Sequence, residues 1–149
     1  MSTEQRVVCT GCGSTNRLPV ERGAKDAKCG TCGTPLFSGR PSDVGGAAFD
    51  RQVRRSTVPV VVDVWAPWCG PCRAMAPEFE KAAQSPEPRA RFIKLNSDNE
   101  QHIASRLGIR SIPTMLLFRE GKEVGRVSGA MSAEQIGRWL GEQLGPSGR

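Results

Sequence analysis

The sequence predicts an α/β fold, in which helices flank a mixed central sheet, with a small separate module at the N-terminus. Two observations predict it. After residue 47, strand-sized runs rich in β-branched residues alternate with helix-compatible segments. Before residue 38, short polar stretches carry two Cys-x-x-Cys pairs and few large apolar side chains. We therefore expect a four-cysteine zinc-ribbon-like module over residues 1–37, a Gly, Pro and Ser-rich linker over 38–46, and an α/β domain over 47–149.

The elements expected in the α/β domain follow a regular order. Helices are expected at 47–55, 69–84, 100–107 and 133–144, and strands at 58–65, 91–95, 114–118 and 123–127. The valine-rich run at 58–65 is typical of a strand that is buried on both faces. Ser42 or Asp43 is a candidate cap for the first helix. Pro77 should kink the second helix, because it removes one backbone donor.

Composition and charge exclude several classes of protein. The chain is 38% hydrophobic and 24% charged, as in an ordinary globular protein. No apolar run approaches the roughly 20 residues of a membrane span, and the N-terminus lacks the basic start and apolar stretch of a secretory signal. We therefore expect a cytoplasmic protein without a membrane partner. The net charge is +6, but the basic residues are scattered among acids, so no nucleic-acid partner is expected.

Cys69 and Cys72 are the candidate catalytic residues. They lie in the segment Trp68-Cys-Gly-Pro-Cys72, where a buried strand is followed by a helix. The unpaired N–H groups and the positive dipole at a helix N-terminus should lower the pKa of the Cys69 thiol and make it a nucleophile. Cys72, one turn further, should then resolve the mixed disulfide. The alternatives are a static disulfide or half of a metal site, but the strand-to-helix setting favours the redox role.

The four N-terminal cysteines are candidate metal ligands. The two pairs, Cys9 with Cys12 and Cys29 with Cys32, are separated by sixteen residues, which is typical of a paired-knuckle zinc site. Four thiolates suit one structural Zn²⁺ per chain, and metal binding would supply folding free energy to a segment without a large core. The alternative of two disulfides is disfavoured in a reducing compartment. His102, distant in the expected third helix, is not expected to be a ligand.

Several further motifs occur in a fixed order along the α/β domain. They are Val62-Asp63, the Cys69 to Cys72 segment, Ala76-Pro77, Lys94-Leu-Asn96, Gly108-Ile-Arg-Ser-Ile-Pro-Thr114 and Gly129-Ala130. With these motifs the chain from about Ala47 to Leu144 resembles the thioredoxin family. The N-terminal cysteines make the whole chain similar to the zinc-containing second type of bacterial thioredoxin. The resemblance implies a thioredoxin fold and protein-disulfide reductase activity on disulfide-containing client proteins. It also implies recharging by an NADPH-dependent thioredoxin reductase and no bound organic cofactor.

The resemblance also implies roles for individual residues. Asp63 would be a buried proton acceptor for the resolving thiol, with Lys94 as its partner; the residue alone leaves open a surface aspartate on an edge strand. Pro113 would be a cis-proline facing the cysteines, although an ordinary trans turn proline remains open. A flat, mostly apolar substrate-binding patch around Cys69 would consist of Trp68, Gly70, Pro71, Ile112, Pro113, Gly129 and Ala130.

Two classes of function remain open at this point. The first is a general protein-disulfide reductase that acts as a monomer. The second is a zinc-ribbon adaptor or redox-regulated chaperone in which the α/β domain is accessory. A third possibility, an exported oxidant or isomerase, is disfavoured by the missing secretory signal and by Gly70-Pro71 between the cysteines, which the family associates with reducing potentials.

Overall fold

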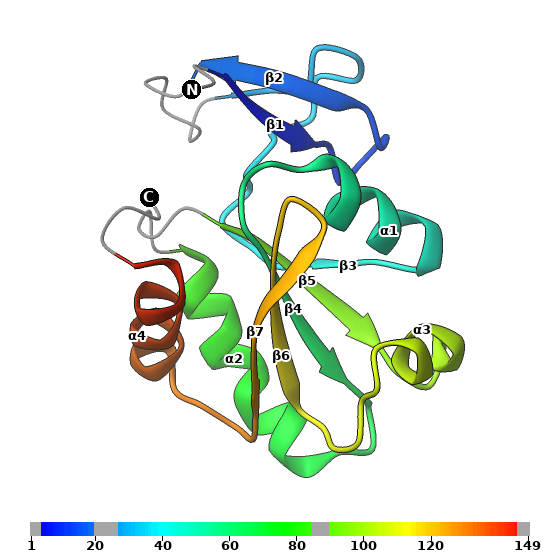
Figure 1. The fold of residues 1–149 in the computed structure, drawn as a ribbon, viewed down its shortest axis with the longest axis vertical. Coiled ribbons are helices and arrows are strands. Elements are labelled where there is room, and N and C mark those ends of the chain that lie inside the picture. The colour runs from blue at the N-terminus through cyan, green and yellow to red at the C-terminus, as the bar shows by residue number, and fades with distance from the viewer. Residues whose placement is uncertain (1–3, 20–26, 85–89, 146–149) are drawn as a thin grey trace.

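A five-stranded mixed sheet forms the centre of the computed structural model, which describes residues 4–19, 27–84 and 90–145 (Figure 1). The strand order is β3-β5-β4-β6-β7. The strands are β3 (Ser42–Asp43), β4 (Val60–Trp65), β5 (Arg91–Asn96), β6 (Thr114–Arg119) and β7 (Lys122–Ser128). The helices are α1 (Gly46–Arg55), α2 (Gly70–Gln84), α3 (Gln101–Arg106) and α4 (Ala133–Leu144). β4 is parallel to β5 and antiparallel to β6, so the sheet is mixed as expected.

Strand β4 divides the interior into two apolar cores. Successive side chains of a strand point to opposite faces of the sheet. Val61 therefore packs on one face with the buried side chains of α2 and α4, such as Phe79 and Leu140. Val60 and the valines two and four positions after it pack on the other face, with Phe49 of α1 and Ile103 of α3. This two-sided burial explains the almost continuous valine run of the central strand.

The helix ends differ in part from the sequence-based expectations. α1 begins after Gly45, which provides no side-chain cap, whereas Ser42 and Asp43 form β3 and pair with β5. The expectation of a cap at those two residues is therefore wrong. α2 continues through Pro77 as one helix. α4 begins with a capping box between Ser132 and Gln135. None of the helices in the described ranges is long and apolar enough to cross a membrane.

The N-terminal segment forms a hairpin, which the sequence did not predict. β1 (Glu4–Val8) pairs antiparallel with β2 (Thr15–Pro19). A small apolar cluster lies beneath it and comprises Val7, Cys9, Leu18, Ala27, Cys29, Leu36 and Val58. Val58 belongs to the α/β domain, just before β4. The module is therefore not without a core, but the larger domain supplies part of that core.

The module and the Cys69 pair lie at opposite ends of the sheet. The hairpin lies against α1 at one end of the molecule (Figure 1). Val58, which packs on it, comes before β4, whereas Cys69 follows the other end of that strand. Since β4 has six residues and a strand rises about 3.3 Å per residue, the two ends are about 20 Å apart.

Phe79 offers a test of the α2 core. Its side chain has no exposed surface and packs on Phe92, with 5.1 Å between the ring centroids. Replacing Phe79 by alanine should destabilise the protein by about 3–5 kcal/mol, through lost burial and a cavity. Urea unfolding followed by tryptophan fluorescence measures this loss, with Val124→Ala on the exposed side of β7 as the control. A loss below about 1 kcal/mol, the usual effect of a surface substitution, would contradict this packing.

Candidate active site and metal centre

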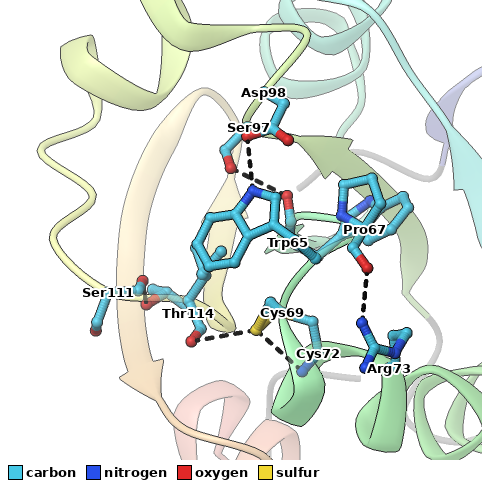
Figure 2. The surroundings of a disulfide bond; sticks show 11 residues. Trp65, Pro67, Cys69, Cys72, Arg73, Ser97, Asp98, Ser111 and Thr114 are labelled. Atoms are coloured by element: carbon cyan, nitrogen blue, oxygen red, sulfur yellow. Dashed lines mark hydrogen bonds between the residues drawn. A yellow bond between two sulfur atoms is a disulfide. The ribbon is translucent and has the colours of Figure 1, made fainter.

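Cys69 and Cys72 form a disulfide where β4 leads into α2 (Figure 2). Their Cα atoms are 5.2 Å apart, because one helical turn brings residues three positions apart close together. Cys69 is 5% exposed and Cys72 is 2% exposed, so the outer sulfur is only slightly more accessible. The backbone amide of Cys72 donates a hydrogen bond to Cys69 Sγ at 3.2 Å. The first turn of α2 thus directs an otherwise unpaired donor at the sulfur that can become a thiolate.

The loop before β6 faces this disulfide. The peptide bond between Ile112 and Pro113 is cis. The Ile112 carbonyl oxygen lies 3.8 Å from Cys69 Sγ. The Pro113 carbonyl accepts a hydrogen bond from the Gly129 amide at 2.9 Å, which ties this loop to the end of β7. The loop thus contacts the Cys69 sulfur directly and is itself held by the end of β7.

The residues chosen from the sequence for a substrate patch differ in exposure. Trp68 is the most exposed, at 68% of its surface. Gly70, Pro71, Gly129 and Ala130 are also exposed, Ile112 is half-buried and Pro113 is buried. The candidate patch therefore combines a large exposed indole with several small exposed residues, whereas Cys69 itself is mostly covered. Such a surface can receive an extended chain without a deep pocket.

Two neighbours of the disulfide were missed by the sequence reasoning. The Trp68 indole nitrogen donates a hydrogen bond to Asp98 Oδ1 at 3.2 Å, and Arg73 donates one to the Pro67 carbonyl at 2.9 Å (Figure 2). Asp98 follows β5, the parallel neighbour of β4. The carboxyl ends of parallel strands lie at the same edge of a sheet, so this rule could have placed Asp98 at the site.

Asp63 is a buried carboxylic acid in the middle of β4. It has no exposed surface, and neither carboxylate oxygen has a hydrogen-bond partner among the described residues. Burial raises its pKa to about 7, although the positive charge of Lys94 opposes that shift. Lys94 lies beside Asp63 in the register of β5, and its Nζ lies 4.5 Å from the centre of the Trp65 ring. The alternative of a surface aspartate is therefore wrong.

Asp63 and Cys72 lie on the same side of the sheet. Asp63 lies two positions after Val61 on β4, so the two side chains point to the same face of the sheet. Met115 pairs with Asp63 across β6, and both Val61 and Met115 pack in the core formed with α2 and α4. Cys72 is a buried residue of the first turn of α2. The buried face of α2, which includes Cys72, therefore packs on the side of the sheet to which Asp63 points.

The four N-terminal cysteines bring their sulfur atoms together, all within 4.8 Å of one another. Cys9 and Cys29 are buried, whereas Cys12 and Cys32 are exposed. The Gly11 amide donates to Cys9 Sγ at 3.3 Å, and the Thr31 amide donates to Cys29 Sγ at 3.4 Å. The two knuckles therefore have the same design, in which a backbone donor points at the first sulfur of each.

Comparison with known families settles the relationship of the chain. A family model described as “Thioredoxin” matches residues 42–142, which is more than half of the sequence. The chain belongs to the thioredoxin family. A second model, described as “Thioredoxin 2, N-terminal”, matches residues 8–34 and represents a zinc ribbon. The resemblance found in the sequence is thus confirmed for both parts of this thioredoxin.

Individual thioredoxins support the same assignment. Thioredoxin C-3 of Corynebacterium nephridii is 36% identical and aligns over 93% of this chain and 94% of its own length. Thioredoxin 1 of Synechococcus elongatus is 42% identical over 68% of this chain and 94% of its own length. The structure of spinach chloroplast thioredoxin F superposes with a TM-score of 0.66 at 32% identity, covering 73% of this chain and 90% of that one. The expected thioredoxin fold is confirmed, and this thioredoxin is a thiol-disulfide oxidoreductase of the disulfide-reductase class.

The thiols of the metal centre differ in their readiness to ionise. Hydrogen bonding from Asn16 lowers the pKa of Cys29 to about 6. Hydrogen bonding with Thr34 lowers the pKa of Cys32, whereas burial raises that of Cys9. Metal ligands must be thiolates, so the lowered pKa values of Cys29 and Cys32 favour the metal-binding form of the second knuckle.

The geometry of the centre fits a tetrahedral metal ion. Cys9 Sγ lies 3.7 Å from Cys32 Sγ, and Cys12 Sγ lies 3.6 Å from Cys29 Sγ. Four sulfurs at the usual Zn–S distance of about 2.3 Å would lie about 3.8 Å from one another in a tetrahedron. A disulfide bond is far shorter, about 2.05 Å, and these four cysteines are free thiols. The four cysteines of this thioredoxin therefore have the spacing and the chemistry that a metal ion requires.

Proposed function

We propose that this thioredoxin reduces client disulfides with Cys69 as the nucleophile and Cys72 as the resolving thiol. The observation that supports this assignment most directly is the position of Cys69 Sγ, which accepts the Cys72 amide at the start of α2 and lies 3.8 Å from the Ile112 carbonyl. An anionic sulfur is stabilised at that helix end. A client sulfur can approach it from the loop side.

The reaction proceeds in two exchanges that balance in sulfur, protons and electrons. In the reduced enzyme, the Cys69 thiolate attacks one sulfur of the client disulfide, forms a mixed disulfide and releases the other client sulfur as a thiolate, which takes up a proton. Cys72 then loses its proton and attacks Cys69 Sγ. The Cys69–Cys72 disulfide forms, the second client thiol leaves, and two electrons have passed to the client.

Asp63 serves in this proposal as the proton acceptor for Cys72. A carboxyl group with a pKa of about 7 can both take and return a proton near neutral pH. It lies on the same side of the sheet as the buried Cys72, so the proton need not cross the sheet. The positive charge of Lys94 limits how far the pKa of Asp63 rises. A fraction of the molecules therefore has Asp63 deprotonated near neutral pH, the form that can accept a proton.

The client binds as an extended segment across the patch around Cys69. The exposed Trp68 indole, Gly70 and Pro71 form one side, and Ile112, cis Pro113, Gly129 and Ala130 form the other. Clients are disulfide-containing proteins, and an NADPH-dependent thioredoxin reductase restores the dithiol. This cycle requires no organic cofactor, nucleic acid or membrane, and one chain in the cytoplasm suffices for it.

Trapping the first intermediate tests the order of the two cysteines. With Cys72→Ser, a stoichiometric mixed disulfide between Cys69 and a model client peptide should accumulate, because no thiol is left to resolve it. Mass spectrometry of the non-reduced adduct gives both the yield and the attached residue. The matched control, Cys69→Ser, should yield no adduct. An adduct on Cys72 with Cys69→Ser would reverse the assignment.

The metal centre is proposed to hold one structural Zn²⁺ on Cys9, Cys12, Cys29 and Cys32. Bound zinc would supply a crosslink among four thiolates, with no open position for a substrate. We propose the division stated from the sequence, with the metal module in 1–37, a joining segment in 38–46 and the redox domain in 47–149. The two exposed sulfurs, Cys12 and Cys32, lie on the outside of this crosslink.

A ligand substitution separates the reductase from the adaptor or chaperone alternative. Cys29→Ser should abolish stoichiometric zinc binding but leave insulin-disulfide reduction of the folded protein within about threefold, because the metal centre lies at the opposite end of β4 from Cys69 and contacts no reacting atom. Zinc content and the reduction rate are measured on the same sample. Deleting 1–37 is a harsher change, since it would uncover Val58 and Arg91. Loss of reduction in parallel with zinc would favour the alternative.

A further inference from the structure

Arg91 is a buried arginine where the metal module meets the redox domain. It is the first residue of β5 and is only 4% exposed. Its Nη2 donates a hydrogen bond to the Val8 carbonyl at 3.0 Å, across 83 positions of sequence. Its guanidinium carbon lies 4.6 Å from the centre of the Phe37 ring. One side chain of the redox domain therefore contacts the module at two places, beside the first knuckle and at its last residue.

The Val8 carbonyl is the fixed point of this contact. It also accepts a hydrogen bond from Gln52 Nε2 of α1, at 3.0 Å, and Gln52 is buried as well. Val8 directly precedes the metal ligand Cys9. Two buried donors from the redox domain thus hold the backbone next to the first knuckle. Removing either donor would take one hydrogen bond from the buried Val8 carbonyl, which is costly.

The charge of Arg91 needs a counterpart. A buried cation is costly unless an opposite charge lies near it. None of the salt bridges among the described residues includes Arg91. Burial lowers its pKa to about 10, and the thiolate of Cys9 opposes that shift, so the side chain stays charged at neutral pH beside the thiol cluster. Four thiolates and one divalent cation carry a net charge of −2, and the single positive charge of Arg91 offsets half of it.

A second arginine lies at the same knuckle. Gly13, just after Cys12, has a φ of +81°, and a β-carbon on it would lie 2.9 Å from Arg51 Nε. Arg51 belongs to α1, as Gln52 does. The redox domain thus presents two guanidinium groups to the backbone around Cys9 and Cys12.

We infer that Arg91 is a positioning residue of the metal centre: it provides, from the redox domain, the charge and the hydrogen bond that hold the Cys9 knuckle for the metal. This inference rests on the zinc site proposed above. Metal retention and the stability of the redox domain are then coupled. Because such coupling is reciprocal, bound metal stabilises the redox domain to the same extent that the domain strengthens metal binding.

Zinc affinity provides the first test and needs no activity measurement. Competition with a chromophoric chelator gives the zinc affinity of the full chain and its variants. Arg91→Met keeps an unbranched apolar stem but removes the guanidinium with its charge and donors, and should weaken zinc binding about 10-fold to 100-fold, as loss of an outer-shell partner does. Arg91→Lys retains the charge without the planar donor group, so its zinc affinity should lie between those of the wild type and Arg91→Met. The matched control is Arg54→Met, on the exposed side of α1, and should match the wild type.

Each outcome of the affinity test decides the question. Unchanged zinc affinity in folded Arg91→Met overturns the inference while leaving the zinc site intact. If Arg91→Met does not fold, Arg91→Lys decides in the same way. A weakening by Arg54→Met as large as that by Arg91→Met also overturns it, because the effect would then follow general surface charge. A wild-type chain that binds no zinc contradicts the zinc site itself.

Domain stability provides the second test. The chain's three tryptophans, Trp65, Trp68 and Trp139, all lie in the redox domain, so their fluorescence reports its unfolding alone. Removing zinc should lower the urea midpoint of the wild type clearly. It should lower the midpoint of Arg91→Met much less. Equal shifts in both proteins, or none in the wild type, would overturn the coupling.

Discussion

Replacing Cys69 by serine should lower the steady-state rate of insulin-disulfide reduction by at least about a thousand-fold, on the scale of losing an essential nucleophile. A serine hydroxyl does not ionise at neutral pH, so the donor from the Cys72 amide would face a neutral oxygen in place of an anionic sulfur. The turbidity assay for insulin reduction, with dithiothreitol as the electron donor, measures the rate.

The matched control for this loss is another cysteine. Cys32→Ser removes an exposed thiol at the opposite end of the molecule and should keep most of the reduction rate. Cys72→Ser should also stop turnover, but it alone should retain one captured client per chain. A Cys69→Ser protein that still turned over at a tenth of the wild-type rate would show that another thiol starts the reaction.

Replacing Asp63 by asparagine should stabilise the protein, most strongly above neutral pH. The pKa of Asp63 is raised from 3.8 to about 7, so the folded state holds the proton more tightly than the unfolded chain. Wild-type stability therefore falls as the pH rises from about 4 through 7. Raising this pKa from 3.8 to about 7 costs the folded state about 4 kcal/mol of stability, and the whole cost applies above that pH range. Asparagine carries no charge at any of these pH values and escapes the loss.

Urea unfolding at pH 5 and at pH 8 measures this effect. The gain from Asp63→Asn should be about 2 kcal/mol at pH 5 and approach about 4 kcal/mol at pH 8. Glu80→Gln replaces an exposed carboxylate of α2 and should show no such dependence. The same Asp63→Asn protein should resolve mixed disulfides more slowly, because Cys72 loses its proton acceptor. An equal gain at both pH values would mean that Asp63 is charged throughout.

The sequence predicted the redox domain better than the module, for physical reasons. The valine run of β4 and the helix that begins beside Cys69 are local patterns, and each is visible within one element. β3 has only two residues in a Gly and Pro-rich stretch, so its pairing with β5 has no local pattern. β1 and β2 are short and polar, and their burial depends on Val58 from the other part of the chain.

The roles of single residues depend even more on distant contacts. The six cysteines could be chosen from spacing alone, because the chemistry of each pair is set within four positions. Arg91 looks like an ordinary polar residue at the start of a strand. Arg91 becomes a buried cation beside a thiol cluster only because the fold places the Val8 backbone against the start of β5. Asp98 was missed for a similar reason, since its contact with Trp68 spans two strands.

The separation of the two sulfur clusters limits which exchanges the molecule can perform on itself. About 20 Å of β4 lies between the metal thiols and Cys69, and thiol exchange requires contact between sulfurs. An oxidised knuckle can therefore not be repaired by the Cys69 of its own chain. Repair therefore needs a thiol from another molecule, such as the dithiol of a second copy, which reaches the exposed Cys12 or Cys32. Recovery of the metal thiols would then follow second-order kinetics and slow in proportion to dilution.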